Sequence, residues 1–267
     1  DHVTLFGTEG EFGTIINEVN FPKAVWILGV LHKVLEFDHN PKFEIRLNNE
    51  KEIFKKQNHF ITYDHDTDEI IKKYNPNAHF YKHTFPLPEY LFELKKENLA
   101  KDADISFVGQ IIKRKGVEDL IDAIYLIKKE KPEIKAKIIG FGGGEYLKLI
   151  QKKIEDADLQ KNISLLGFID DNKDVMYEIK KSRVFVLPTH VDVNPTSVSE
   201  SMALGVPVVS YNLDGLNILI KNGESGLLVE RGDISGLAKA IIELLDNQEL
   251  TKRIVAKAFE FTFENFH

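Results

Sequence analysis

One stretch of sequence decides the fold of this chain: Asp192-Val-Asn-Pro-Thr-Ser-Val-Ser-Glu-Ser-Met-Ala-Leu-Gly-Val-Pro-Val-Val-Ser210. The apolar residues before it predict a strand that ends near Leu187, and after a polar loop a helix is expected to begin near Ser197. Gly205 is the expected end of this helix, because glycine adopts a positive φ at little cost. Another buried strand, 206–210, is predicted to follow directly. Strand, loop, helix and strand in this order are typical of an α/β protein with parallel strands.

The polar loop in this stretch has the position of a ligand-binding loop. In an open parallel sheet, ligands bind at the carboxyl ends of the strands, where helix N-termini offer unpaired N–H groups and a dipole that favours a diphosphate. Asp192 on the loop and Glu200 in the helix are placed to reach one ligand from two ends. A second interpretation stays open, because Ser197-x-x-Glu200 is also the pattern of a capping box. Asp192 would then be a solvated loop acid.

The alternation of strands and helices continues through the second part of the chain. Short β-branched runs predict strands, and apolar residues at helical spacing predict helices with one buried face. The expected strands are 105–108, 136–139, 163–166, 184–187 and 206–210, and the expected helices are 117–127, 145–154 and 234–245.

The first part of the chain shows the same pattern less regularly. The expected strands are 3–6, 24–28, 59–62 and 79–81, with helical pieces near 13–19, 50–56 and 67–74. The stretch His83–Asp104, which holds Pro86, Pro88 and a run of charges, is the expected linker. We therefore expect an α/β fold of two Rossmann-like domains in tandem, 1–98 and 99–267, in a chain truncated at both ends, so that the first domain is incomplete.

Composition argues against several classes of function. The 267 residues carry a net charge of −7, with charges of both signs interspersed, which does not favour nucleic acid as a partner. The chain has no cysteine, which excludes disulfides, zinc–thiolate sites and cysteine nucleophiles. No apolar run reaches the roughly 18–20 residues that span a bilayer.

The stretch Asp192–Ser210 resembles the donor motif of glycosyltransferase family 4, the group 1 glycosyltransferases of the GT-B fold. That motif is an acid, seven residues, a glutamate and then Ala-Met-Ala-x-Gly-x-Pro-Val-Val, and the stretch from Glu200 matches it except for Ser201 in place of alanine. Asp192 stands where a glutamate is usual. The resemblance implies that Glu200 holds the ribose of a nucleotide sugar and that Asp192 is the catalytic residue. It also implies that sugar and phosphate are held by Asp192 and the loop residues Val193, Asn194, Pro195, Thr196 and Ser197.

A second segment, Phe107-Val-Gly-Gln-Ile-Ile-Lys-Arg-Lys-Gly116, resembles the Gly-Arg-Leu-x-x-x-Lys-Gly loop of the same family, whose arginine and lysine clasp the diphosphate. Gln110 occupies the arginine position, and a neutral amide cannot make a bidentate charged contact, so Lys113 or Arg114 is expected to compensate. For Lys115 alone, a solvated lysine is the alternative. The phosphate-binding residues that the resemblance implies are Gly109, Gln110, Lys115 and Gly116.

Further segments resemble regions of the same family and follow in the same order along the chain. Ile138–Gly142 and Ile163–Ile169 resemble the region around the nucleobase, and Asn222–Asp233 resembles the entry to the penultimate helix. The implied nucleobase residues are Gly142, Phe168 and Ile169.

The first part of the chain resembles the acceptor-side domain of the family more weakly. The glycine-rich segment Phe6–Gly13 and the segment Asn75–Ala78 have counterparts there. The histidine usual after the second strand is not in register, and His32 is expected to be a surface or packing residue.

Three patterns are given little weight. Asp64–Asp68 contains residue types that bind metal ions, but it is expected at a helix start, where the helix dipole favours acidic side chains. Asp102-Ala-Asp104 is expected in the linker. Gly140–Gly144 is a poor dinucleotide fingerprint, since Glu145 occupies the third glycine position, which argues against an oxidoreductase. No metal site is expected.

With the resemblance, the sequence predicts a retaining glycosyltransferase that moves a hexose from a nucleotide diphosphate sugar to a glycan or lipid-linked hydroxyl acceptor, without metal or other cofactor. The resemblance implies bacterial polysaccharide biosynthesis and a cytoplasmic location, with peripheral contact to the inner membrane surface through segments outside this sequence. Two alternatives stay open: a sugar-nucleotide epimerase of similar fold, and a nucleotide-sugar-binding protein with impaired catalysis.

Overall fold

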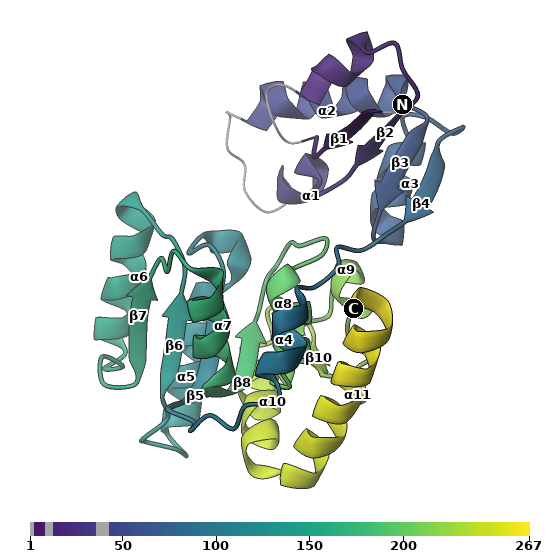
Figure 1. Ribbon diagram of the computed structural model, residues 1–267. Coiled ribbons are helices and arrows are strands. Elements are labelled where there is room, and N and C mark those ends of the chain that lie inside the picture. Colours follow the sequence, from purple (N-terminus) through teal and green to yellow (C-terminus); the bar gives the residue numbers. More distant parts are fainter. Residues whose placement is uncertain (1–2, 9–12, 36–42) are drawn as a thin grey trace. The chain divides into compact units, whose positions relative to one another are not determined.

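The chain folds into two compact units, shown in Figure 1. The computed structural model describes residues 3–8, 13–35 and 43–267. Residues 1–85 and 191–194 form the first unit, and residues 86–190 and 195–267 form the second. The division after Phe85 lies earlier in the chain than the boundary expected between residues 98 and 99.

The first unit contains a parallel sheet whose described strands lie in sequence order, and all four occur where the sequence predicts them. Val25, Phe60 and Phe80 are register neighbours across three strands, and they pack with Phe54 and Ile71 of the helices into a small core. The strands are β1 (Val3–Phe6), β2 (Lys23–Trp26), β3 (His59–Thr62) and β4 (His79–Lys82). The described helices are η1 (Gly13–Glu18), α1 (Leu31–Leu35), α2 (Phe43–Lys56) and α3 (His65–Lys72). The predicted glycine-rich segment 6–13 lies partly outside the described residues.

The second unit contains a six-stranded parallel sheet in the order β10-β9-β8-β5-β6-β7. Its strands are β5 (Ala103–Val108), β6 (Ala136–Ile139), β7 (Ile163–Gly167), β8 (Ser182–Leu187), β9 (Val208–Tyr211) and β10 (Leu227–Val229). The chain proceeds from β5 outward to β7, and then from β8 outward to the opposite edge. The direction of winding therefore reverses between β5 and β8.

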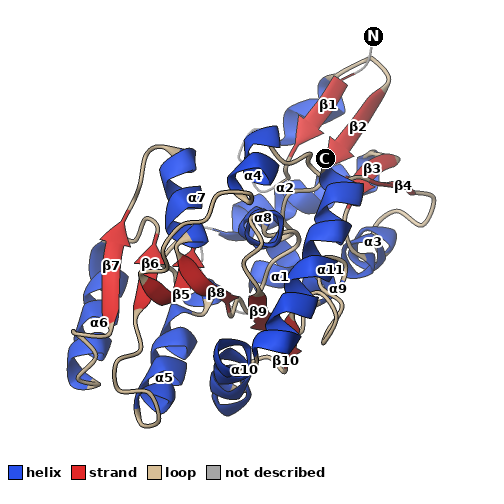
Figure 2. Ribbon diagram, turned by 60° about the horizontal axis from the view of Figure 1, so that its bottom comes forward, coloured by secondary structure: helices blue, strands red, loops and turns tan. Residues whose placement is uncertain are grey.

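Helices cover both faces of this sheet (Figure 2). One layer holds α5 (Val117–Lys128), α6 (Gly144–Asp156) and α10 (Ile234–Asp246), and the short η2 (Lys113–Lys115) precedes α5. The other holds α4 (Glu89–Leu94), α7 (Asn172–Lys180), α8 (Thr196–Ala203) and α11 (Gln248–Phe266), and the short α9 (Asp214–Asn217) follows β9. The predicted apolar face of α5, which includes Leu120, Ile121 and Ile124, is fully buried.

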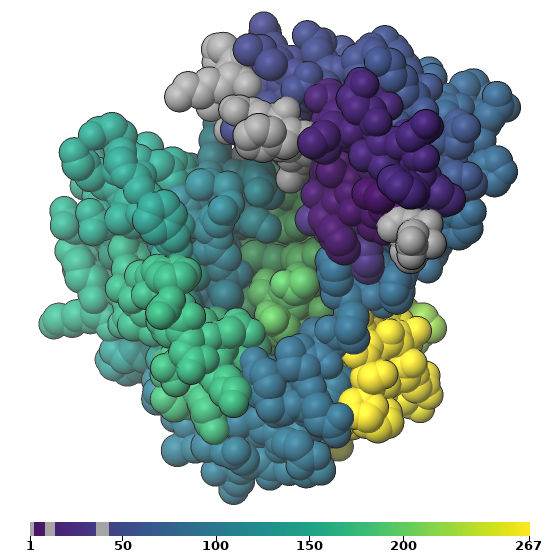
Figure 3. Space-filling view, turned by 45° about the horizontal axis from the view of Figure 1, so that its top comes forward, coloured from purple at the N-terminus to yellow at the C-terminus, as the bar shows by residue number. Residues whose placement is uncertain are grey.

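The expected linker His83–Asp104 is wrong from Glu89 onward, because α4 and the first residues of β5 lie within it. Leu91, Phe92 and Leu94 of α4 are buried in the core of the second unit, and Phe92 makes edge contacts with Phe259 and Phe263 of α11. In Figure 3 blue atoms of this part of the chain lie beside the yellow atoms of α11. The prolines and charges that suggested a linker surround a short amphipathic helix. Within the described part of the chain, no helix is long and apolar enough to cross a membrane.

Candidate functional site

The strand order of the second unit brings two connections together. β5 and β8 are hydrogen-bonded neighbours, and their following connections run to opposite edges of the sheet. Open α/β sheets bind ligands at the carboxyl ends of strands at such a switch point. The predicted phosphate residues Gly109, Gln110, Lys115 and Gly116 follow β5, and the predicted sugar-binding loop follows β8. The two segments selected from the sequence therefore leave adjacent strands at the same edge.

Gly116 fixes the approach of these two connections. It follows η2 with a φ of +71° and is the N-cap residue of α5. A Cβ atom at this position would lie 1.8 Å from the carbonyl oxygen of Pro188, which is the first residue after β8. Only glycine fits both the backbone conformation and the space. The Lys115-Gly116 pair thus has a structural reason for its glycine, and the role of Lys115 toward phosphate stays a prediction.

Two further glycines pack the neighbouring connections. A Cβ on Gly140, after β6, would lie 1.8 Å from the carbonyl oxygen of Gly109. A Cβ on Gly142 would lie 2.6 Å from the Cβ of Ile111. The connection after β6 therefore lies directly against the predicted phosphate loop. This close approach gives Gly140 and Gly142 of the glycine-rich run a structural reason.

Glu200 does not cap its helix. α8 begins at Thr196 with Pro195 as N-cap, and within the described chain no side chain makes a cap hydrogen bond at this end, so the capping-box interpretation is wrong. Glu200 is instead half-buried, with Asn172 of α7 as a side-chain hydrogen-bond partner. Burial raises the pKa of Glu200, and the Asn172 hydrogen bond opposes that rise. Asn172 also donates to the hydroxyl of Tyr90 at 3.2 Å.

The end of α8 follows the prediction closely. Gly205 has a φ of +70°, as expected for a glycine after the last helical turn. Its N–H donates to the carbonyl of Met202 at 3.0 Å, and the N–H of Val206 donates to the carbonyl of Ser201 at 2.9 Å, which is the Schellman pattern. Ser201 is fully buried, and its hydroxyl donates to the carbonyl of Ser197 at 2.6 Å. The helix can therefore hold serine where the family has alanine.

The predicted sugar-binding loop is divided between the two units. Asp192, Val193 and Asn194 group with the first unit, and Pro195, Thr196 and Ser197 with the second. Pro195 precedes α8, and Thr196 and Ser197 open it, so N–H groups of its first turn follow β8 as the sequence predicts. The role of Asp192 as the catalytic residue stays a prediction.

A cavity of about 180 Å³ lies at the carboxyl ends of β6 and β7. Gly142 and Phe168, two of the predicted nucleobase residues, line it, while Ile169 packs against the core of the second unit. Phe141 and Phe168 are 67% and 68% exposed, so two aromatic side chains meet solvent beside this cavity. Phe141 and Gln151 also line it. No sequence pattern marked either residue as part of the site, although Phe141 lies inside the glycine-rich run 140–144.

Three polar residues that the sequence analysis missed form a cluster beside the phosphate loop. The hydroxyl of Tyr211 donates to Oδ2 of Asp119 at 2.6 Å, and Nε2 of His190 lies 3.0 Å from the same oxygen. Burial acts to raise the pKa of Asp119, but the hydrogen bonds from His190 and Tyr211 outweigh it and lower that pKa. Burial and the bond to Asp119 raise the pKa of Tyr211. No local pattern could have joined residues so far apart in sequence.

His32 in the first unit is a packing histidine, as expected. Its Nδ1 lies 2.7 Å from Oε2 of Glu50, and its Nε2 lies 2.7 Å from the hydroxyl of Tyr74. Glu50 is fully buried and also accepts from the backbone N–H of Leu31 at 3.0 Å. Both ring nitrogens of His32 therefore serve the core.

The acidic patterns have structural roles. Asp64 caps α3, accepting from the N–H of Thr67 at 2.7 Å, as the sequence predicts. Asp104 lies in β5, not in a linker, and accepts from Arg183 at 3.0 Å. The linker position was wrong because β5 begins at Ala103, before the apolar run. Over the described residues, no group of three or more His, Cys, Asp or Glu side chains is arranged to hold a metal ion.

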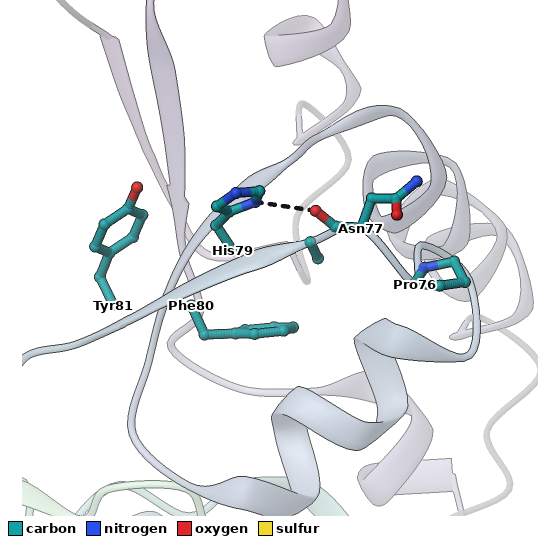
Figure 4. Close-up of a pocket in the computed structure, with 6 residues that line it drawn as sticks. Pro76, Asn77, His79, Phe80 and Tyr81 are labelled. Atoms are coloured by element: carbon teal, nitrogen blue, oxygen red, sulfur yellow. Dashed lines mark hydrogen bonds between the residues drawn. The ribbon is translucent and has the colours of Figure 1, made fainter.

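A shallow hollow in the first unit lies at the turn into β4 (Figure 4). It is lined by residues 76–81, which overlap the segment Asn75–Ala78 that resembles the acceptor-side domain. Figure 4 shows Nδ1 of His79 bonded to the carbonyl oxygen of Asn77, at 2.9 Å, and the ring of Phe80 on the other side of the strand from Tyr81. The side chain of Asn75 accepts from the N–H of Asn77 at 3.0 Å, so this segment builds a turn.

Comparison with known proteins finds a family match in the second part of the chain. The family described as "Glycosyl transferases group 1" matches residues 92–261. Poly(glycerol-phosphate) alpha-glucosyltransferase of Bacillus subtilis is 32% identical over 154 residues, which are 57% of this chain and 22% of the relative. The capsular polysaccharide biosynthesis glycosyltransferase CapM of Staphylococcus aureus is 30% identical over 178 residues, covering 64% of this chain and 44% of the relative. The chain thus spans less than half the length of these curated relatives.

Solved structures share the fold. Sucrose-phosphate synthase from Thermosynechococcus elongatus has a TM-score of 0.84 at 19% identity, over 100% of this chain and 69% of that one. A mutant of S. aureus TarM in complex with fondaparinux, alpha-GlcNAc-glycerol and UDP has a TM-score of 0.80 at 21% identity, over 99% of this chain and 52% of that one. At such identities the likeness establishes the architecture of both units, each a Rossmann-like sheet of the GT-B kind.

Proposed function

Because the chain belongs to the group 1 glycosyltransferases, we propose that it takes a nucleotide diphosphate sugar as donor and transfers the sugar to a hydroxyl acceptor. Donor binding is assigned to the second unit, at the switch point between β5 and β8. The two predicted donor segments leave neighbouring strands there, and the contact between Gly116 and Pro188 holds them together.

The proposal rests chiefly on the carboxylate of Glu200. A carboxylate out of water is unfavourable unless it accepts several hydrogen bonds, and it has room for about four. Asn172 supplies one neutral donor, and burial raises the pKa of Glu200. A ribose ring carries two adjacent hydroxyls, which would donate to the two carboxylate oxygens. A ligand whose hydroxyl groups donate hydrogen bonds to the carboxylate therefore offsets the free-energy cost of burying Glu200.

The donor diphosphate is assigned to the helix N-termini after β5 and β8. The N–H groups in the first turn of α8, and Lys115 before α5, supply positive partial or full charge at this edge. Gln110 is exposed and cannot add charge, so Lys113 and Arg114 are the neighbouring cations that would share the phosphate. We propose that these groups offset the charge of the leaving diphosphate without a metal ion.

The proposed reaction breaks the bond between the anomeric carbon and the diphosphate oxygen. The acceptor hydroxyl oxygen bonds to that carbon from the face that the diphosphate leaves, so the anomeric configuration is retained, and the hydroxyl proton passes to the departing phosphate oxygen. Preorganised donors at the phosphate stabilise the charge that develops there. Asp192 is proposed to orient the sugar.

A glycan or another polyol is the proposed acceptor class. The relatives named above act on poly(glycerol-phosphate) or belong to capsular polysaccharide biosynthesis, and the TarM structure contains alpha-GlcNAc-glycerol. These facts concern those proteins, and they support an acceptor rich in hydroxyl groups here.

The test is calorimetric titration of the 267-residue chain with UDP-, GDP- and ADP-glucose, and with NAD as a control ligand. Saturable binding of one of the three sugars, and none of NAD, is expected. Product analysis then separates the reactions: sugar on an added polyol indicates transfer, and an epimerised nucleotide sugar without acceptor indicates an epimerase. Binding without either product would indicate a binding protein. Failure of all three sugars to bind would contradict the proposal.

A further inference from the structure

The cluster of Asp119, His190 and Tyr211 joins three separate elements of the second unit. Asp119 is in the first turn of α5, His190 lies in the connection after β8, and Tyr211 ends β9. One oxygen of Asp119 serves both partners: the hydroxyl of Tyr211 is 2.6 Å away and Nε2 of His190 is 3.0 Å away. The rings of His190 and Tyr211 are 5.4 Å apart, so they also pack on each other.

The backbone around His190 bears on the predicted phosphate loop. The N–H of His190 donates to the carbonyl of Arg114 at 2.8 Å, and the hydroxyl of Thr189 donates to the same carbonyl at 3.1 Å. Pro188 fills the space beside Gly116. His190 thus anchors the connection after β8 to the β5–α5 connection, two residues before the predicted sugar-binding residue Asp192.

The side-chain bond adds a direction that the backbone bonds do not supply. Both anchors described above reach one atom, the carbonyl oxygen of Arg114, and the guanidinium of Arg231 donates to the carbonyl of His190 at 3.4 Å. The imidazole of His190 reaches a separate point in the first turn of α5, the Asp119 carboxylate. Asp119 is a firm partner, because Tyr211 holds the same oxygen and the two hydrogen bonds lower the pKa of the acid.

We propose that His190 is a positioning residue for donor binding. Its Nε2–H bond to Asp119 sets the direction in which the sugar-binding loop leaves β8, relative to the phosphate loop after β5. This inference rests on the proposed function, since it assigns the two loops to one nucleotide sugar. His190 acts through the loop and not by contact with the donor.

Substitutions separate this role from general stabilisation. His190→Ala removes the bond to Asp119, whereas His190→Gln keeps an N–H donor at a similar distance from the backbone. Tyr146→Phe is the matched control, because it removes a tyrosine hydroxyl bond of 3.1 Å to the neighbouring acid of α5, Glu118, and leaves the bonds of Asp119 in place. If His190 only stabilised the fold, the alanine and phenylalanine variants would behave alike: each would lower the melting temperature and leave the donor dissociation constant unchanged.

The experiment measures the donor dissociation constant of the full 267-residue chain by calorimetry, with whichever of UDP-, GDP- and ADP-glucose binds the unsubstituted protein, and the melting temperature without ligand. His190→Ala is expected to weaken donor binding about tenfold, and His190→Gln to restore it to within about threefold. Tyr146→Phe should lower the melting temperature and leave the dissociation constant unchanged.

Two outcomes would overturn the inference: unchanged donor binding in His190→Ala, or equal weakening in Tyr146→Phe and His190→Ala. An unsubstituted chain that binds none of the three sugars contradicts the proposed function itself, which is a different result.

Discussion

The carboxyl group of Glu200 on α8 shares a hydrogen bond with the side-chain amide of Asn172 on α7, in surroundings where burial raises its pKa. The Glu200 carboxyl group therefore adds little to the stability of the protein when no ligand is bound. Acids that serve binding are commonly held in this way, at some cost to stability.

Removal of this charge should therefore stabilise the chain when no ligand is bound. A carboxyl group whose pKa is raised by folding contributes stability that is present below its unfolded pKa of about 4.5 and is lost as the pH rises through the folded pKa. Glu200→Gln should thus gain about 1 kcal/mol over the unsubstituted protein at pH 8, and close to nothing at about pH 4.5. Chemical unfolding at both pH values measures this, and a variant that is less stable at pH 8 would contradict the account.

Gly116 should tolerate no side chain. A Cβ atom there would meet the carbonyl oxygen of Pro188 at 1.8 Å, and φ is positive. Gly223 is the matched control, since its φ is +78° but no atom lies within 4 Å of the position that a Cβ would take. Gly223→Ala should cost about 1 kcal/mol from backbone strain alone, and Gly116→Ala at least about 3 kcal/mol. Equal losses in the two variants would show that the Pro188 contact is unimportant.

Ser201 should be replaceable by the residue usual in the family. Its buried hydroxyl donates to a carbonyl of its own helix, Ser197, at 2.6 Å, and bonds of this kind add little to a helix. Ser201→Ala should change the free energy of unfolding by less than about 1 kcal/mol, whereas Met202→Ala, which empties a fully buried position, should cost about 2–4 kcal/mol. A large loss in Ser201→Ala would mean that the hydroxyl has another partner.

Phe168 should contribute to nucleotide binding and not to stability. Its side chain is 68% exposed beside the cavity at the ends of β6 and β7. If the base stacks there, Phe168→Ala should weaken binding of the free nucleoside diphosphate by about 1 kcal/mol or more. Leu149→Ala, which changes an exposed apolar residue of α6 outside this cavity, should not affect binding. Equal affinity in both variants would place the base elsewhere.

Sequence patterns located the second unit well because its signals are local. Apolar spacing identified α5, and Gly205 marked the end of α8 through its φ of +70°. The missed helix α4 illustrates the opposite case. Pro88 and the charges after Leu94 outweighed three buried apolar residues of α4, of which Phe92 contacts Phe259 and Phe263 of α11, far along the chain.

The candidate site also combines features with a local sequence signal and features that depend on long-range contacts. Whether Glu200 can complete a capping box depends on where α8 begins, because the box needs Ser197 as the N-cap residue. The N-cap residue is Pro195, two residues earlier. The cluster around Asp119 could not be predicted, because Tyr211 lies 92 residues away and nothing local distinguishes either side chain. Sheet topology brings them together, and topology follows from long-range packing.

The central claim is that Glu200 holds the ribose of a nucleotide sugar, and calorimetric titration of Glu200→Gln tests it most directly. The control is Glu243→Gln, an exposed residue of α10. With the sugar nucleotide that binds the unsubstituted chain, Glu200→Gln should bind about 10- to 100-fold more weakly, and Glu243→Gln should bind unchanged. Undiminished binding in a folded Glu200→Gln chain would contradict the assignment of the donor site.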